Sequence, residues 1–88
     1  MEVSYTDIAK ADLQYWKGTH NSKIQTRISQ LILSIQQDPF KGLGKPEPLK
    51  HQFKGCWSRR IDRKNRLIYE IQDNRIFILS LKGHYKTD

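Results

Sequence analysis

The sequence predicts a single α+β domain, residues 1–88, in which two helices pack on a twisted antiparallel sheet in the order β-α-α-β-β-β. Three observations support this fold class. A chain of 88 residues can form one modest hydrophobic core. Two segments of the first half have apolar residues at helical spacing. Three segments of the second half are short, rich in β-branched and aromatic residues, and separated by turn residues.

The first half begins with a short strand that is followed by a helix. Val3 and Tyr5 alternate with polar residues, which is the two-residue period of a strand. Thr6 or Asp7 can cap the helix that follows, and Gly18 ends it. The apolar stripe of this helix consists of Ala9, Leu13 and Trp16.

A second, more strongly patterned helix comes next. Asn21 or Ser22 can cap it, and Pro39 stops it because proline lacks the amide hydrogen that a helix needs. Its apolar residues, which we expect in the core rather than in a ligand site, are Ile24, Ile28, Leu31, Ile32 and Ile35. Residues 38–50 contain all three prolines and two of the glycines, so they predict a loop of restricted shape.

The second half predicts a meander of three antiparallel strands. We expect the strands at residues 56–61, 66–72 and 75–81, with turns at 62–65 and 73–74. The sequence therefore predicts that all three strands share one sheet with the helices on one face.

Antiparallel pairing then predicts which residues are neighbours. A two-residue turn at 73–74 places Ile71 opposite Ile76 and, counting back, Arg66 opposite Leu81. The preceding turn places Ile61 opposite Arg66. The face that receives the helices then holds Leu67, Tyr69, Ile71, Ile76 and Ile78. The other face, where we expect the site, holds Trp57, Arg59, Arg66, Ile68, Glu70, Phe77 and Leu79, although a one-residue bulge would invert this assignment.

The formal charge of +7 is concentrated in one segment of the chain. Residues 41–66 contain nine basic and two acidic side chains, whereas the charges outside this segment cancel. Such clustering is typical of a surface that binds nucleic acid. The alternative is a solvated face that only keeps the protein in solution.

Several features argue against membrane and secreted classes. The longest apolar run, residues 76–79, is too short to cross a bilayer, and the N-terminus lacks the pattern of a signal peptide. Cys56 is the only cysteine, so no internal disulfide can form. We therefore expect a cytoplasmic protein with no membrane segment.

Three side chains have the chemistry for cleaving RNA without a metal, which needs a base, an acid and a cation at the phosphate. Arg66 can hold two phosphate oxygens and stays charged at any working pH. The predicted register brings Arg66 within reach of His84, and a histidine can act as the acid because this residue type titrates near neutrality. Glu47 stands between Pro46 and Pro48, so a stiff loop presents a carboxylate among basic residues.

Each of these residues also has an ordinary explanation. A carboxylate that balances nearby lysines, a surface arginine on a strand and a C-terminal surface histidine are all common. A metal site made of Glu47, His51 and His84 is a further alternative, although no pair has the ligand spacing of one helix or strand. We expect neither a metal nor a cofactor.

The ordered motifs of the second half resemble those of a known family. They are Pro39-Phe40-Lys41-Gly42, the run from Gly44 to His51, Trp57-Ser58-Arg59-Arg60-Ile61, Arg66-Leu67-Ile68-Tyr69 and His84-Tyr85. In these motifs the chain resembles the YoeB/Txe toxins of the RelE superfamily. The resemblance extends over nearly the whole chain, but the first half matches mainly in length and in details such as Tyr15-Trp16.

The resemblance implies a microbial-ribonuclease-like fold and a toxin of a type II toxin–antitoxin system. It also implies cleavage of mRNA in the ribosomal A site, inhibition by a YefM-type antitoxin, and a homodimer. Glu47 matches the family's general base, Arg66 its phosphate-stabilising arginine and His84 its general acid. The residues that match positions around that site are Lys50, His51, Arg59 and Tyr85. A non-catalytic module that binds RNA or the ribosome is the alternative from another functional class.

The C-terminus departs from the family pattern. Family members usually end Arg-Tyr-His-Tyr, whereas this chain has Lys82-Gly83-His84-Tyr85 and three further residues. Because position 83 has a glycine instead of an aromatic residue, base stacking would weaken. The glycine would also loosen the placement of His84. If residue 83 has a negative φ, a tyrosine at this position is expected to raise activity.

Overall fold

A computed structural model describes residues 1–83 of the chain. The elements in chain order are β1 (Glu2–Tyr5), α1 (Asp7–Gly18), α2 (Ser22–Gln37), β2 (Glu47–Pro48), β3 (Cys56–Arg60), β4 (Arg66–Gln72) and β5 (Arg75–Ser80). One turn of 3-10 helix, His51–Phe53, lies between β2 and β3. The predicted fold class and element order are confirmed, and β2 is an additional short strand inside the predicted loop.

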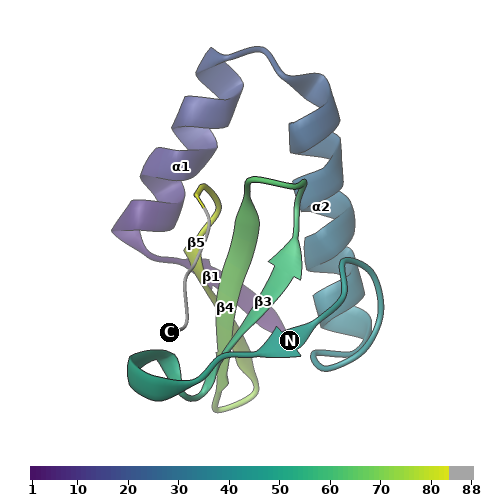
Figure 1. Cartoon of the computed structure of the whole chain (residues 1–88), viewed down its shortest axis with the longest axis vertical. Helices are drawn as coiled ribbons and strands as arrows, with labels where there is room; N and C mark the ends of the chain where they lie inside the picture. The colour runs from purple at the N-terminus through teal and green to yellow at the C-terminus, as the bar shows by residue number, and fades with distance from the viewer. Residues whose placement is uncertain (84–88) are drawn as a thin grey trace.

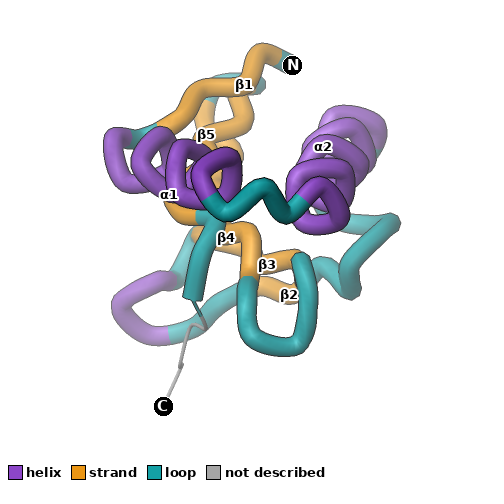
Figure 2. The backbone as a smooth tube through the Cα atoms, turned by 90° about the horizontal axis from the view of Figure 1, so that it is seen from above, coloured by secondary structure: helices purple, strands orange, loops and turns teal. Residues whose placement is uncertain are grey.

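The strands form one mixed sheet in the order β1-β5-β4-β3-β2. Only β1 departs from the predicted antiparallel arrangement, because it pairs with β5 in parallel. Figure 2 shows the sheet running from β1 to β2, with both helices toward the end where β1 and β5 lie. The short strand β2 therefore forms the edge of the sheet that is farther from the helices.

Side-chain caps determine where the helices begin. The Thr6 hydroxyl accepts a hydrogen bond from the amide of Ala9 in α1, and the Asn21 side chain accepts one from Ile24 in α2, both at 3.1 Å. α2 ends at Gln37, shortly before the proline that was expected to stop it. Figure 1 shows the two helices diverging from their short connection.

The core lies between the helices and one face of the sheet. Its buried members are Ala9, Trp16, Ile28, Leu31, Ile35, Ile61, Leu67, Tyr69, Ile76, Ile78 and Leu81. α1 is also tied to the end of β5, because the Trp16 indole N–H donates to the Leu81 carbonyl at 2.8 Å. The Asp12 carboxylate accepts from the Leu81 amide, also at 2.8 Å. The predicted helix-facing residues of β4 and β5 are thus confirmed.

The pairing of β4 with β5 follows the prediction only near their shared turn. Ile71 pairs with Ile76 as expected, but a bulge next to Ile68 moves its partner on by one residue, to Ser80. The sequence carries no local mark of this bulge, so counting back from the turn gives the wrong partner for every residue before it.

The bulge gives Arg66 a different partner from the predicted one. The amide of Arg66 donates to the carbonyl of Gly83 at 3.0 Å, so the expected pairing of Arg66 with Leu81 is wrong. Leu81 is buried in the core instead. The Gly83 amide donates to the Asn65 side chain at 2.9 Å, which fastens the end of the described chain beside Arg66.

The pairing of β3 with β4 also differs from the prediction by one residue. Arg60, and not Ile61, pairs with Arg66, so the connection is five residues long, 61–65, rather than four. A slip of one residue moves each strand side chain to the opposite face. Trp57 and Arg59 consequently lie on the helix-facing side, and their predicted place on the other face is wrong.

Candidate functional site

The face of the sheet turned away from the helices, called the open face below, carries the candidate site. Glu47 in β2 pairs with Ser58, and Arg60, two residues further along β3, pairs with Arg66. Directly paired residues of antiparallel strands point to the same face, and so do residues two apart on one strand. One row across the sheet therefore holds a carboxylate, and the next row holds two guanidinium groups.

These two rows are close enough to act on one nucleotide. Glu47 and Arg66 are separated by two strand spacings, about 10 Å, and by two residues along the strands, about 7 Å. Arginine and glutamate both have long side chains that can reach across part of this distance. A ribose and its adjacent phosphate could be contacted from both sides.

Short backbone contacts hold Glu47 at the edge of the sheet. The Leu49 amide donates to the carbonyl of Cys56 at 2.9 Å, and the Arg60 amide donates to the carbonyl of Gly44 at 2.7 Å. These two bonds lie on either side of the pairing of Glu47 with Ser58. The Glu47 side chain is exposed, so its carboxylate is accessible to a substrate on this face.

Arg66 is half-buried and is oriented by the turn that precedes it. Its Nη1 donates to the carbonyls of Asp62 at 2.6 Å and Asn65 at 3.2 Å. Within residues 1–83 its Nε and Nη2 have no hydrogen-bond partner. The guanidinium is therefore anchored on one side and can offer N–H groups to a phosphate on the other.

Asp62 organises this turn. Its Oδ1 accepts hydrogen bonds from the amides of Lys64 at 2.8 Å and Asn65 at 2.7 Å. Burial acts to raise the pKa of the Asp62 carboxyl, but the hydrogen bonds and the charge of Arg66 outweigh it and hold that pKa below its usual range. The ionised carboxylate thus supports the position of Arg66.

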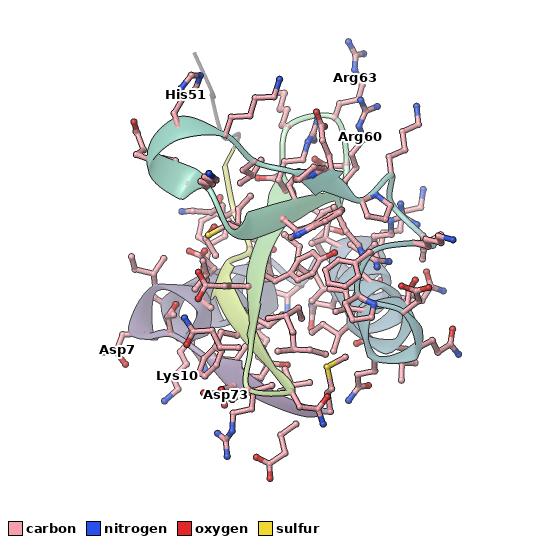
Figure 3. All side chains as sticks on the ribbon, turned by 90° about the horizontal axis from the view of Figure 1, so that it is seen from below. Asp7, Lys10, His51, Arg60, Arg63 and Asp73 are labelled. Atoms are coloured by element: carbon pink, nitrogen blue, oxygen red, sulfur yellow. The ribbon has the colours of Figure 1, made fainter. Side chains whose placement is uncertain are left out.

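Lys50 and His51 follow β2 and are exposed. Figure 3 shows His51, Arg60 and Arg63 along the same side of the molecule, whereas the labelled residues of α1 and of the β4–β5 turn lie on the opposite side. These three residues of segment 41–66 thus gather on one side of the molecule. This is the arrangement expected of a surface that contacts polyphosphate.

Arg59 does not lie on the open face, where the sequence predicted it. Arg59 has no exposed surface, and its guanidinium contacts the end of α2 and the loop after it. In this position it cannot touch a substrate on the open face. Arg60 is the exposed arginine of β3 beside Arg66 and was missed, because two adjacent arginines on a strand face opposite ways and only the register tells which is which.

His84 and Tyr85 lie outside the described residues. The last described residue, Gly83, is bound through its carbonyl to Arg66 and through its amide to Asn65. Among residues 1–83, no three His, Cys, Asp or Glu side chains form a group that could hold a metal ion. No helix in that range is long and apolar enough to cross a membrane.

Two hollows lie elsewhere on the surface. One of about 580 Å³ lies between the start of α2 and Ile61 and Asp62, and one of about 140 Å³ lies between α1 and α2. Neither is lined by Glu47, Arg60 or Arg66.

Comparisons with known proteins identify the family of this chain. Residues 5–85 match the family model described as the YoeB-like toxin of bacterial type II toxin–antitoxin systems. The chain is 42% identical over 86 residues to the Toxin YoeB of Synechocystis sp., with 98% of this chain and 99% of that protein covered. Both comparisons extend over the strands that carry the candidate site.

Solved structures resemble the chain over the same length. A YoeB/ParE toxin from Agrobacterium tumefaciens superposes with a TM-score of 0.93 at 34% identity, covering 97% of this chain and 100% of that one. The Staphylococcus aureus YoeB, solved with YefM and as a dimer, superposes with TM-scores of 0.86 and 0.87. Its identities are 37% and 36%, with 97% of this chain and 98% of that one covered. The chain therefore belongs to the family of YoeB-like toxins of bacterial type II toxin–antitoxin systems.

Proposed function

We propose that this toxin is an endoribonuclease that cleaves mRNA in the A site of the ribosome. The observation that carries the proposal is the open face on which Glu47 lies next to the pair Arg60 and Arg66. A carboxylate beside two guanidinium groups can accept a proton while the charge that builds on a phosphate is stabilised. The basic residues around this face would hold the RNA backbone.

In the proposed reaction Glu47 removes the proton of the ribose 2′-hydroxyl. The 2′-oxygen attacks the adjacent phosphorus, and the bond from phosphorus to the 5′-oxygen breaks. Arg66 stabilises the phosphate oxygens during this step, and Arg60 is placed to assist it. The products are a 2′,3′-cyclic phosphate and a 5′-hydroxyl, and no metal or cofactor takes part.

His84 is the proposed acid that protonates the leaving 5′-oxygen. Support comes from Gly83, which hydrogen bonds to Arg66 and is joined to His84 by one peptide bond. Tyr85, Lys50 and His51 are proposed to bind the substrate around this centre. We do not extend that role to Arg59, whose side chain is buried.

The proposed partners are a YefM-type antitoxin and a second copy of the toxin. The S. aureus YoeB has been solved both with YefM and as a dimer, which supports both proposals. The charge of +7 would favour an antitoxin segment rich in acidic residues. Because its substrate is mRNA on ribosomes, the toxin is proposed to act in the cytoplasm.

The decisive experiment incubates the wild-type toxin and the Glu47→Gln protein with ribosomes programmed with mRNA. Loss of the base is expected to lower the cleavage rate by roughly 10² to 10⁴. The matched control is Glu2→Gln, the same change in an exposed residue of β1 at the opposite edge of the sheet. It should cleave at the wild-type rate.

The chemistry of the product ends completes this test. Cyclic phosphate and 5′-hydroxyl ends agree with attack by the 2′-hydroxyl. If the wild-type toxin binds ribosomes but leaves the mRNA intact, the protein is the alternative, a module that binds without cleaving. A wild-type rate in a folded Glu47→Gln protein would remove Glu47 from the mechanism.

A further inference from the structure

Arg59 is fully buried, and protein groups use all of its hydrogen-bonding capacity. A guanidinium has five N–H groups. Its Nε donates to the Tyr69 hydroxyl at 3.1 Å, Nη1 to Ser34 Oγ at 2.7 Å and the Leu43 carbonyl at 3.0 Å, and Nη2 to the carbonyls of Asp38 at 2.8 Å and Lys41 at 3.0 Å. Three of these five acceptors are carbonyls of the loop that follows α2.

This buried charge makes no ion pair within residues 1–83. A charge removed from water is tolerated only when polar groups surround it. Here the carbonyl dipoles of residues 38–43 replace water, so the conformation of the loop and the burial of Arg59 depend on each other. Displacing one carbonyl would leave an unsatisfied N–H of a charged group.

The loop passes close to the arginine at two glycines. Gly42 has a φ of +120°, and a Cβ there would lie 2.5 Å from Ser34 Oγ and 3.3 Å from Arg59 Nη1. Gly44 has a φ of +87°, and a Cβ there would lie 2.6 Å from Leu31 and 3.2 Å from the Arg59 Cβ. Only glycine combines this backbone conformation with so close an approach.

Tyr69 links the arginine to the start of the loop. Its hydroxyl accepts from Arg59 and donates to the Pro39 carbonyl at 2.6 Å. Burial raises the pKa of the Tyr69 phenol although Arg59 acts to lower it, so the hydroxyl keeps the proton that it donates. Ser34 Oγ completes the network by accepting from the Leu43 amide at 3.0 Å.

The fixed loop leads directly into the strand that carries the proposed base. The Leu43 carbonyl is held by Arg59, and the carbonyl of the next residue, Gly44, accepts from the Arg60 amide. Three residues later comes Glu47, in a two-residue strand at the edge of the sheet. So short an edge strand depends on its flanking segments for its position.

We propose that Arg59 is a positioning residue, which fixes residues 38–44 and thereby sets where the Glu47 carboxylate lies on the opposite face of the sheet. The catalytic part of this inference rests on the proposed role of Glu47 as the base. Arg59 itself does not touch the substrate. Its effect reaches the site through the backbone of the loop and of β2.

The test removes single partners of the guanidinium and keeps its charge. Tyr69→Phe and Ser34→Ala are the variants, and Tyr5→Phe in β1 and Ser29→Ala in α2 make the same chemical changes away from Arg59. The first pair should lower kcat on programmed ribosomes by roughly tenfold to a hundredfold with KM nearly unchanged, because a displaced base costs rate rather than binding. The control pair should match the wild type.

A second readout does not depend on activity. Hydrogen exchange of backbone amides in residues 43–49 should be faster in Tyr69→Phe and Ser34→Ala than in their controls, because the loop then opens more often. Ile28→Val, a mild core variant, measures the effect of general destabilisation. Exchange in residues 43–49 that follows overall stability alone in all variants would overturn the proposal.

A double mutant separates the two proposals. If Arg59 acts through Glu47, Tyr69→Phe should cause little further loss in a Glu47→Gln background, whereas equal losses in both backgrounds would contradict positioning. A wild-type rate for Glu47→Gln alone would overturn the proposed function and the catalytic part of this inference. The exchange experiment would still decide whether Arg59 fixes the loop.

Discussion

At the scale of single residues, burial distinguishes three arginines. One is part of the core, and the other two belong to the candidate site. Arg59 is buried on the helix side, whereas its neighbour Arg60 is exposed on the open face next to Arg66. A planar guanidinium suits both places, since it satisfies several carbonyls in the core and several phosphate oxygens at the surface. A lysine would not fully replace the arginine in either place.

We predict that Arg59→Lys lowers the free energy of unfolding by about 3 kcal/mol, because an ammonium group cannot replace five N–H donors in fixed directions. Arg60→Lys is the matched control and should change it by less than about 0.5 kcal/mol. Urea unfolding of both variants measures the difference. Equal stabilities would show that the contacts of Arg59 contribute little.

Gly83 gives a second prediction at this scale. Its φ is +91°, so the condition under which tyrosine was expected to raise activity is not met. Nothing lies within 4 Å of a Cβ at this position, so a substitution strains only the backbone. Gly83→Ala and Gly83→Tyr should each lose about 1 kcal/mol of stability and gain no cleavage activity.

Gly18→Ala is the control for this substitution, because Gly18 also has open space around its Cβ but lies in α1. Alanine there should leave stability unchanged or raise it by up to about 1 kcal/mol. Thermal unfolding and cleavage assays on the three variants give the comparison. Higher activity of Gly83→Tyr would show that base stacking outweighs the backbone strain.

At the scale of elements, the connection between β3 and β4 links the sheet to the site. It places Arg60 opposite Arg66, and its Asn65 binds Gly83. Asp62 accepts the amides inside this connection and lies near the Arg66 charge. The arrangement of the arginines thus depends on one carboxylate.

This dependence predicts a pH effect. The pKa of Asp62 is lower in the folded protein than the value of about 3.9 expected for an unfolded chain. Its contribution to stability is therefore present above that pH and is lost as pH falls through the folded pKa. Asp62→Asn should be less stable than the wild type at pH 7, and the difference should shrink toward pH 3.

Unfolding by urea at several pH values measures this difference. Asp7→Asn, a change in an exposed acid of α1, controls for the loss of one negative charge. A stability difference between Asp62→Asn and the wild type that stays constant from pH 7 to pH 3 would contradict the prediction.

At the scale of the whole molecule, the excess charge is unevenly placed. Segment 41–66 carries the net +7, and its exposed members Lys54, Arg63 and Lys64 lie outside the proposed catalytic group. RNA binding by such residues releases counterions and therefore weakens as salt rises. The segment should govern affinity even where it does not touch the cleaved bond.

We predict that replacing Lys54, Arg63 and Lys64 with glutamine weakens binding to RNA or ribosomes and makes it less sensitive to salt. The slope of log K against log salt should fall by roughly 0.7 to 0.9 for each phosphate that the variant no longer neutralises. Changing Lys10, Lys17 and Lys23 to glutamine removes the same charge outside the segment and should leave the slope nearly unchanged. Identical slopes of log K against log salt for both triple variants would show that the segment only keeps the protein in solution.

Local sequence patterns were sufficient for much of this molecule. Helical spacing and caps predicted α1 and α2, and strand propensity with turn residues predicted the bounds of β4. The same patterns, with the family resemblance, led to Glu47 and Arg66, which the structure brings to one face. These features depend on neighbouring residues, which a linear sequence displays directly.

Only the tertiary structure decided the partners across the sheet. The parallel pairing of β1 with β5, the bulge next to Ile68 and the five-residue connection before Arg66 all involve residues distant in the chain or extra residues without a local signal. Because strand side chains alternate between faces, each single-residue step reverses their assignment. For this reason the sequence could place an arginine at the site, but only the folded sheet could decide between Arg59 and Arg60.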